Sequence, residues 1–107
     1  MYRASTPKQI FIFPTDIREY ADEVLITYAQ NGNIVFEKQK SDLEFVEQVG
    51  DDFKFAFYLT QEETNLFKPN LSVEVQVRIK TLGPNPKVIP SEIFRISVKD
   101  VLNDEVL

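Results

Sequence analysis

The sequence predicts an antiparallel all-β domain, a sandwich or a barrel, of about seven short strands. In the run Leu71–Lys80 every odd position is apolar and every even position is polar. Because side chains alternate between the two faces of a strand, this run is a strand with one buried and one solvated face. A second signal is Asn31-Gly32, which lies between two apolar runs and is typical of a β-hairpin.

The first half of the chain holds three predicted strands. Lys8–Phe13 lies between two prolines, and because proline cannot donate to a sheet, this run is predicted as an edge or first strand. The charged segment Asp16–Asp22 is predicted as a connection. Glu23–Gln30 and Ile34–Lys40 flank the Asn-Gly turn and form the two strands of the hairpin.

Four further strands are expected from Asp42 onward. Asp42–Val49 is the weakest of them. Phe53–Leu59 places three phenylalanines and a leucine on one face, which predicts a strand at the centre of the core. Leu71–Lys80 follows, and the last strand is Glu92–Lys99, with its alternate apolar residues predicted to face inward: Phe94, Ile96 and Val98.

The connections carry recognisable end signals. Thr60-Gln-Glu-Glu63 matches a capping box, so one short helical turn is predicted over Thr60–Phe67, crossing between the sheets. Leu82–Lys87 is rich in Gly and Pro and is predicted as a turn. Residues 1–107 form one domain, in which Asp100–Leu107 is a tail with apolar and acidic residues.

Composition disfavours several classes of partner. The net charge of −5 opposes binding to nucleic-acid phosphates, and there is no basic cluster for anionic lipid. No apolar run approaches the roughly 20 residues of a membrane span, and no leader-like apolar segment is visible. We therefore expect no nucleic-acid or membrane partner, and synthesis in the cytoplasm without export.

Catalytic chemistry is also not indicated. The chain contains no His and no Cys, which removes the usual general base, the commonest zinc ligand and any thiolate site. Asp51-Asp52 is interpreted as a solvated turn rather than a calcium site, and Glu62-Glu63 as helix-cap residues rather than an acid pair. We expect no catalytic residue, no metal, no cofactor and no enzymatic activity.

A surface for protein contacts is the remaining candidate site. Phe11 and Phe13 alternate with Ile10 and Ile12, so both faces of the first strand are apolar. Such a strand is either buried between two layers or covers a partner. A third reading is a carbohydrate platform built on exposed tyrosines, for which the candidates are Tyr2, Tyr28 and Tyr58.

Three segments carry a family resemblance: Tyr28-Ala-Gln-Asn-Gly32, Leu59-Thr-Gln-Glu-Glu-Thr64 and Asp104-Glu-Val-Leu107. With them the chain resembles short prophage-encoded proteins of Gram-positive gut bacteria. These are similar in outline to the immunoglobulin-like N-terminal domain of phage baseplate upper proteins, which attach receptor-binding proteins to a tail. The resemblance implies a single antiparallel immunoglobulin-like β-sandwich and transfers no catalytic residue.

The resulting expectation is a non-enzymatic phage structural or assembly protein, synthesised in the bacterial cytoplasm, associated with the baseplate or tail and incorporated in the virion. Its partners would be other phage structural proteins or further copies of itself, as a homo-oligomer. The alternative is a carbohydrate-binding module on a host-facing virion component. The predicted interaction surface comprises residues of the first strand and of the tail: Phe11, Phe13, Val101, Leu102, Val106 and Leu107.

Overall fold

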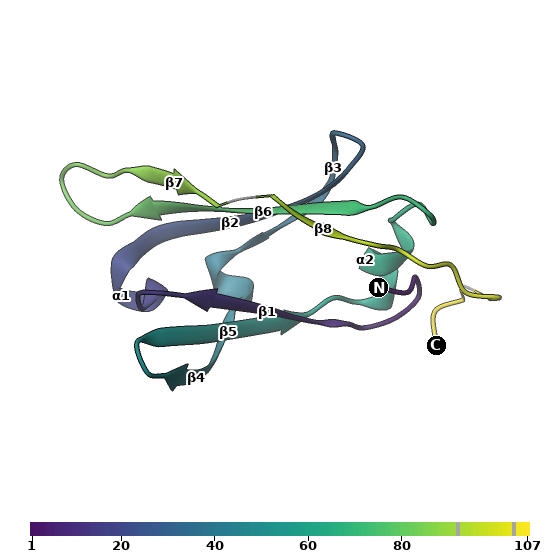
Figure 1. The fold of residues 1–107 in the computed structure, drawn as a ribbon, viewed down its shortest axis with the longest axis horizontal. Helices are drawn as coiled ribbons and strands as arrows, with labels where there is room; N and C mark the ends of the chain where they lie inside the picture. Colours follow the sequence, from purple (N-terminus) through teal and green to yellow (C-terminus); the bar gives the residue numbers. More distant parts are fainter. Residues whose placement is uncertain (92, 104) are drawn as a thin grey trace.

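Two antiparallel sheets pack face to face in the computed structural model, which describes residues 1–91, 93–103 and 105–107 (Figure 1). The smaller sheet has the order β1-β5-β4, formed by Lys8–Phe13, Asp52–Tyr58 and Glu44–Val49. The larger sheet has the order β3-β2-β6-β7, and β8 also pairs with β6. Its strands are β2 (Ala21–Gln30), β3 (Asn33–Gln39), β6 (Val73–Thr81), β7 (Val88–Pro90) and β8 (Phe94–Ile96).

The strand order is that of an immunoglobulin sandwich without its first strand. In that fold one sheet runs A-B-E-D and the other G-F-C, with an additional C′ strand in variable-type domains. Here β1, β5 and β4 take the B, E and D positions, while β2, β6 and the β7–β8 pair take C, F and G, with β3 at C′. Among the described residues, no strand stands in the A position beside β1. The predicted antiparallel immunoglobulin-like sandwich is confirmed.

The β2–β3 hairpin turns where the Asn-Gly signal predicts. Gln30 lies opposite Asn33, so the loop consists of Asn31 and Gly32 alone. Both have positive φ, 51° and 79°, as a two-residue turn that follows the twist of the strands requires. Asn tolerates this conformation and Gly adopts it without steric cost.

The core lies between the inner faces of the two sheets. Val73, Val75 and Val77 are buried, as the alternation in Leu71–Lys80 predicts, but β6 begins only at Val73 and Leu71 is exposed. Tyr28 is fully buried at the centre, and its ring stacks on that of Phe36 with centroids 4.7 Å apart. The facing sheet and the crossing segment contribute four further core residues: Phe55, Phe57, Leu59 and Phe67. Phe53, the third phenylalanine predicted on that face, is only partly buried and packs against the core.

The helical turns differ from the single one predicted. Over α2 (Gln61–Asn65) the capping box is present: the Glu63 N–H donates to Thr60 Oγ1 (3.1 Å) and the Thr60 N–H to Glu63 Oε1 (2.9 Å). However, the segment predicted as a plain connection contains α1 (Ile17–Tyr20), and a 3₁₀ turn η1 (Lys40–Asp42) precedes β4. Asp16 caps α1 by accepting from the Arg18 N–H (3.0 Å), a local signal that the charged composition masked.

The last predicted strand is wrong in extent. Position 92, its start, lies outside the described residues. Ladder pairing is confined to β8, apart from a single bridge between Lys99 and Tyr2, and β7 was not predicted. Ser91 separates the two strands, donating its N–H to Val77 O (2.7 Å) and accepting from the Val77 N–H (3.0 Å). Val98 is buried as expected, but Phe94 is 55% exposed. Phe94 lies opposite Val75 on the inward side, and it is exposed because no described strand covers it.

Candidate functional site

An apolar hollow of about 540 Å³ opens between the edge of β1 and the strands β6, β7 and β8. We call it the β1 groove. Figure 1 shows β1 at the margin of its sheet, in the layer that faces β6 and β8. The described residues that line the groove come from both sheets and from the segment after β1: Gln9, Ile10, Phe11, Ile12, Phe13, Pro14, Thr15, Tyr20, Val75, Val77, Ile79, Ile89, Pro90, Ser91, Phe94 and Ile96.

The groove forms because β1 is apolar on both faces and is the outermost strand of its sheet. Phe11 and Phe13 point inward and belong to the core or pack against it, with Phe13 buried. Ile10 and Ile12 lie on the other side of the strand and are 53% and 60% exposed. The hollow therefore extends from the core to the surface, and its rim consists of large apolar side chains.

The free edge of β1 also presents backbone hydrogen-bonding groups. The Leu59 N–H donates to Pro7 O (3.1 Å), which fixes the phase of pairing with β5. In an antiparallel pair, residues alternate between those bonded to the neighbouring strand and those directed away from it. The N–H and C=O groups of Lys8, Ile10 and Ile12 therefore point to the edge where, among the described residues, no strand pairs with β1.

The groove offers an apolar surface and little acid–base chemistry. None of its described lining residues is Asp, Glu, Lys or Arg. Within residues 1–91, 93–103 and 105–107, no group of three or more acidic side chains could hold a metal ion. Burial strongly raises the pKa of the Tyr28 phenol, but this group lies in the core, where its hydroxyl donates to Gln9 Oε1 (3.0 Å). This arrangement can bind an apolar partner.

The carboxylates weighed as candidate sites have structural positions. Glu63 caps α2 and forms an ion pair with Lys38 of β3. Asp51 and Asp52 are exposed at the turn between β4 and β5. In the described part of the chain, no helix is long and apolar enough to cross a membrane.

The structure does not bring the two predicted surfaces together. Phe11 and Phe13 line the β1 groove. Val106 and Leu107 instead lie against Tyr58 and the start of α2, where the Leu107 N–H donates to Gln61 Oε1. The two hollows share no lining residue. Of the other tail residues, Val101 is partly buried and Leu102 fully exposed.

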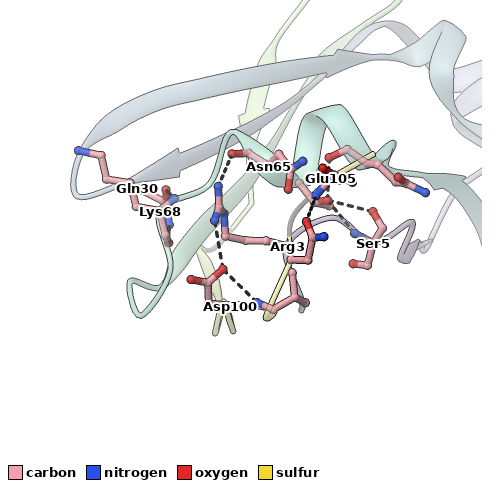
Figure 2. Close-up of polar contacts among 11 residues, drawn as sticks. Arg3, Ser5, Gln30, Asn65, Lys68, Asp100 and Glu105 are labelled. Carbon is pink, nitrogen blue, oxygen red and sulfur yellow. Dashed lines mark hydrogen bonds and ion pairs between the residues drawn. The ribbon is translucent and has the colours of Figure 1, made fainter. Parts of the chain in front are cut away.

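Polar contacts hold the N-terminal segment away from the groove. Arg3 donates to the Asn65 carbonyl of α2 and to the Asp100 carboxylate, both at 3.1 Å (Figure 2). The Arg3 N–H also donates to Lys99 O (3.0 Å), and the Ser5 carbonyl accepts from the Thr64 hydroxyl (2.9 Å). The N-terminal segment is thus paired with the end of the chain and with α2.

Comparisons with known proteins give a structural similarity and no sequence family. No family model and no curated protein matches this chain. A solved structure described as the V domain of amphioxus IgVJ-C2 is 13% identical, with a TM-score of 0.36 over 92% of this chain and 96% of that chain.

Proposed function

We propose that this chain is a non-enzymatic structural or assembly protein of a phage tail or baseplate, and that it acts by binding another protein at the β1 groove. The observation that carries the proposal is the groove itself. It combines a contiguous apolar surface, free of Asp, Glu, Lys and Arg among its described residues, with an unpaired strand edge. Large exposed apolar patches of this kind mark interaction sites, and free edges accept further strands.

The phage setting is supported by the resemblance alone. Two of its segments have scaffold positions in the fold. Tyr28–Gly32 supplies the central core tyrosine and the hairpin turn, and Leu59–Thr64 supplies the cap of α2. The resemblance is therefore a similarity of framework, while the groove provides the surface for contact.

Quantitative mass spectrometry of washed phage particles, released from an induced host culture, tests the proposal. We expect the chain at a fixed copy number relative to the other tail proteins, and that number would indicate the symmetry of its ring. A structural role is contradicted if the chain remains in the lysate and is absent from particles. An assembly role then requires that it co-purify with unfinished tails.

The arrangement of the tyrosines gives less support to a carbohydrate-binding module. Tyr28 is fully buried and cannot contact a sugar. Tyr58 and Tyr2 are exposed, but they have different neighbours. Lys8 Nζ is 5.9 Å from the Tyr58 ring centroid, whereas Lys99 Nζ is 5.6 Å from the Tyr2 ring centroid. Binding on a glycan array that survives substitution of the groove residues would favour this alternative.

A further inference from the structure

We propose that the β1 groove accepts one extended, uncharged apolar segment of a partner polypeptide, which adds as a strand to the free edge of β1. The segment would take the A position, which no described strand fills. This inference rests on the proposed function and specifies the partner's chemistry.

The backbone of β1 argues for a peptide rather than a small apolar ligand. The N–H and C=O groups of Ile10 and Ile12, two residues that line the groove, face the free edge. An apolar molecule that filled the groove would exclude water from these groups and leave them unpaired, which is unfavourable. A strand supplies a carbonyl for each N–H and an N–H for each carbonyl while its side chains fill the hollow.

The walls specify the side chains of the occupant. Side chains of an added strand alternate between the interior and the surface. Those directed inward would contact Phe11, Val77 and Phe94, and the described lining contains no cation or carboxylate to pair with a buried charge. The partner segment therefore has uncharged apolar residues at alternate positions, over a length that matches the 6 residues of β1.

Segments of this chain fit poorly. In the tail, Asp104 and Glu105 are adjacent, so either register would direct one carboxylate into the apolar hollow. The N-terminal residues are held by Lys99 and Asn65. Two copies placed groove to groove would join two concave surfaces and fill neither. The occupant is therefore a segment of a different protein.

Titration with a synthetic peptide tests this proposal. The probe alternates valine with threonine between terminal lysines, and binding is followed by amide resonances and hydrogen exchange in the intact chain. We expect saturable binding, with new protection at the amides of Lys8, Ile10 and Ile12. A control peptide with its central valine replaced by glutamate should bind at least about tenfold more weakly, since a buried charge would lack a partner.

Two variants locate the site. Ile10→Pro removes an edge N–H that forms no bond within the sheet, and it should weaken peptide binding about tenfold, whereas Ile10→Val should not. Phe94→Asp places a charge on the groove wall at a half-exposed position, and Ile34→Asp places one on β3 outside the groove. Only the former should impair binding, with thermal unfolding confirming that each variant is folded.

Three results would overturn the inference. The first is no binding at millimolar peptide, and the second is binding unaffected by both Ile10→Pro and Phe94→Asp. The third is self-association in sedimentation experiments without peptide, abolished by Ile10→Pro, because this would identify a second copy as the occupant. If the peptide fails while phage particles contain the chain, the proposed function stands and the strand-addition inference alone is wrong.

Discussion

At the scale of single residues, Tyr28 shows how a polar atom is accommodated in an aromatic core. Its ring lies among Phe36, Phe57 and Phe67, and its hydroxyl donates to Gln9 Oε1. Burial, with Glu63 nearby, raises the pKa of this phenol well above its ordinary value, because the ionised form would lose its hydration. The burial that keeps Tyr28 from contacting a sugar therefore also makes the stability of the fold depend on pH in the alkaline range.

Stability should fall above about pH 10, the ordinary pKa of tyrosine. Above that pH the unfolded chain loses the Tyr28 proton while the folded chain retains it, so the free energy of unfolding decreases by up to about 1.4 kcal/mol per pH unit. Denaturant unfolding of the wild type and of Tyr28→Phe between pH 8 and about pH 11 measures this. The variant should show a shallower slope, and parallel slopes would contradict the assigned burial.

The capping residue of α2 gives a second prediction. Thr60→Ala leaves the Glu63 N–H without its acceptor at the start of the helix and should lower the free energy of unfolding by about 1 kcal/mol. Thr60→Ser keeps the acceptor oxygen and should lie close to the wild type. Chemical denaturation compares the three proteins, and equal losses in both variants would show that the methyl group, not the cap, is responsible.

At the scale of elements, the hairpin of β2 and β3 depends on a turn that most residues cannot form. Gly32→Ala retains φ near 79° only with strain and should lower the free energy of unfolding by about 1 kcal/mol. Asn33→Ala, at an exposed strand position, should change it by less than about 0.5 kcal/mol. Thermal denaturation of both variants provides the comparison, and a neutral Gly32→Ala would argue against the turn geometry.

The elements that could be predicted are those whose signals are local. The alternation in β6, the Asn-Gly turn and the Thr60 capping box each act within a few residues, and each is confirmed. The break at Ser91 instead depends on hydrogen bonds to Val77, far away in sequence. The C-terminal residues Val106 and Leu107, which were predicted to share an interaction surface with Phe11, lie beside α2 and not in the β1 groove. The sequence does not show this, because contacts between residues far apart in the chain decide their position.

The sequence predicted one wall of the groove, β1, but not the other. The apolar residues on both faces of β1 indicate either burial or a partner, and the structure shows one buried face and one exposed face: Phe13 is buried and Ile12 is exposed. The opposite wall, with Ile89 and Phe94, was missed because it requires knowledge of which strands face β1. The nearest available signal was the run Val88-Ile89-Pro90 after the turn.

At the scale of the whole molecule, the sandwich is closed by its core and open along one side. The contacts of Arg3 and Lys99 fasten the two ends of the chain to each other and to α2. The side next to β1 remains uncovered by the described residues. Under the proposal, this uncovered side is the position at which a segment of another chain joins the sandwich.

Deleting Val101–Leu107 tests whether the groove or the C-terminal tail of the chain makes the contact with a partner. Because the groove and the hollow beside the tail share no residue, we expect the deletion to leave peptide binding and incorporation into particles unchanged, and to alter the free energy of unfolding by less than about 1 kcal/mol. Loss of incorporation with the fold intact would restore the tail as the docking element.

Photo-crosslinking in assembled particles tests most directly the claim that the β1 groove binds a phage protein. A photoreactive amino acid replaces Ile10 in one variant and Ile34, outside the groove, in another, and crosslinked peptides are sequenced by mass spectrometry. We predict that the variant at Ile10 crosslinks to one apolar, extended segment of a tail protein and that the variant at Ile34 does not. Equal crosslinking from both positions, or crosslinks only between copies of this chain, would contradict the account.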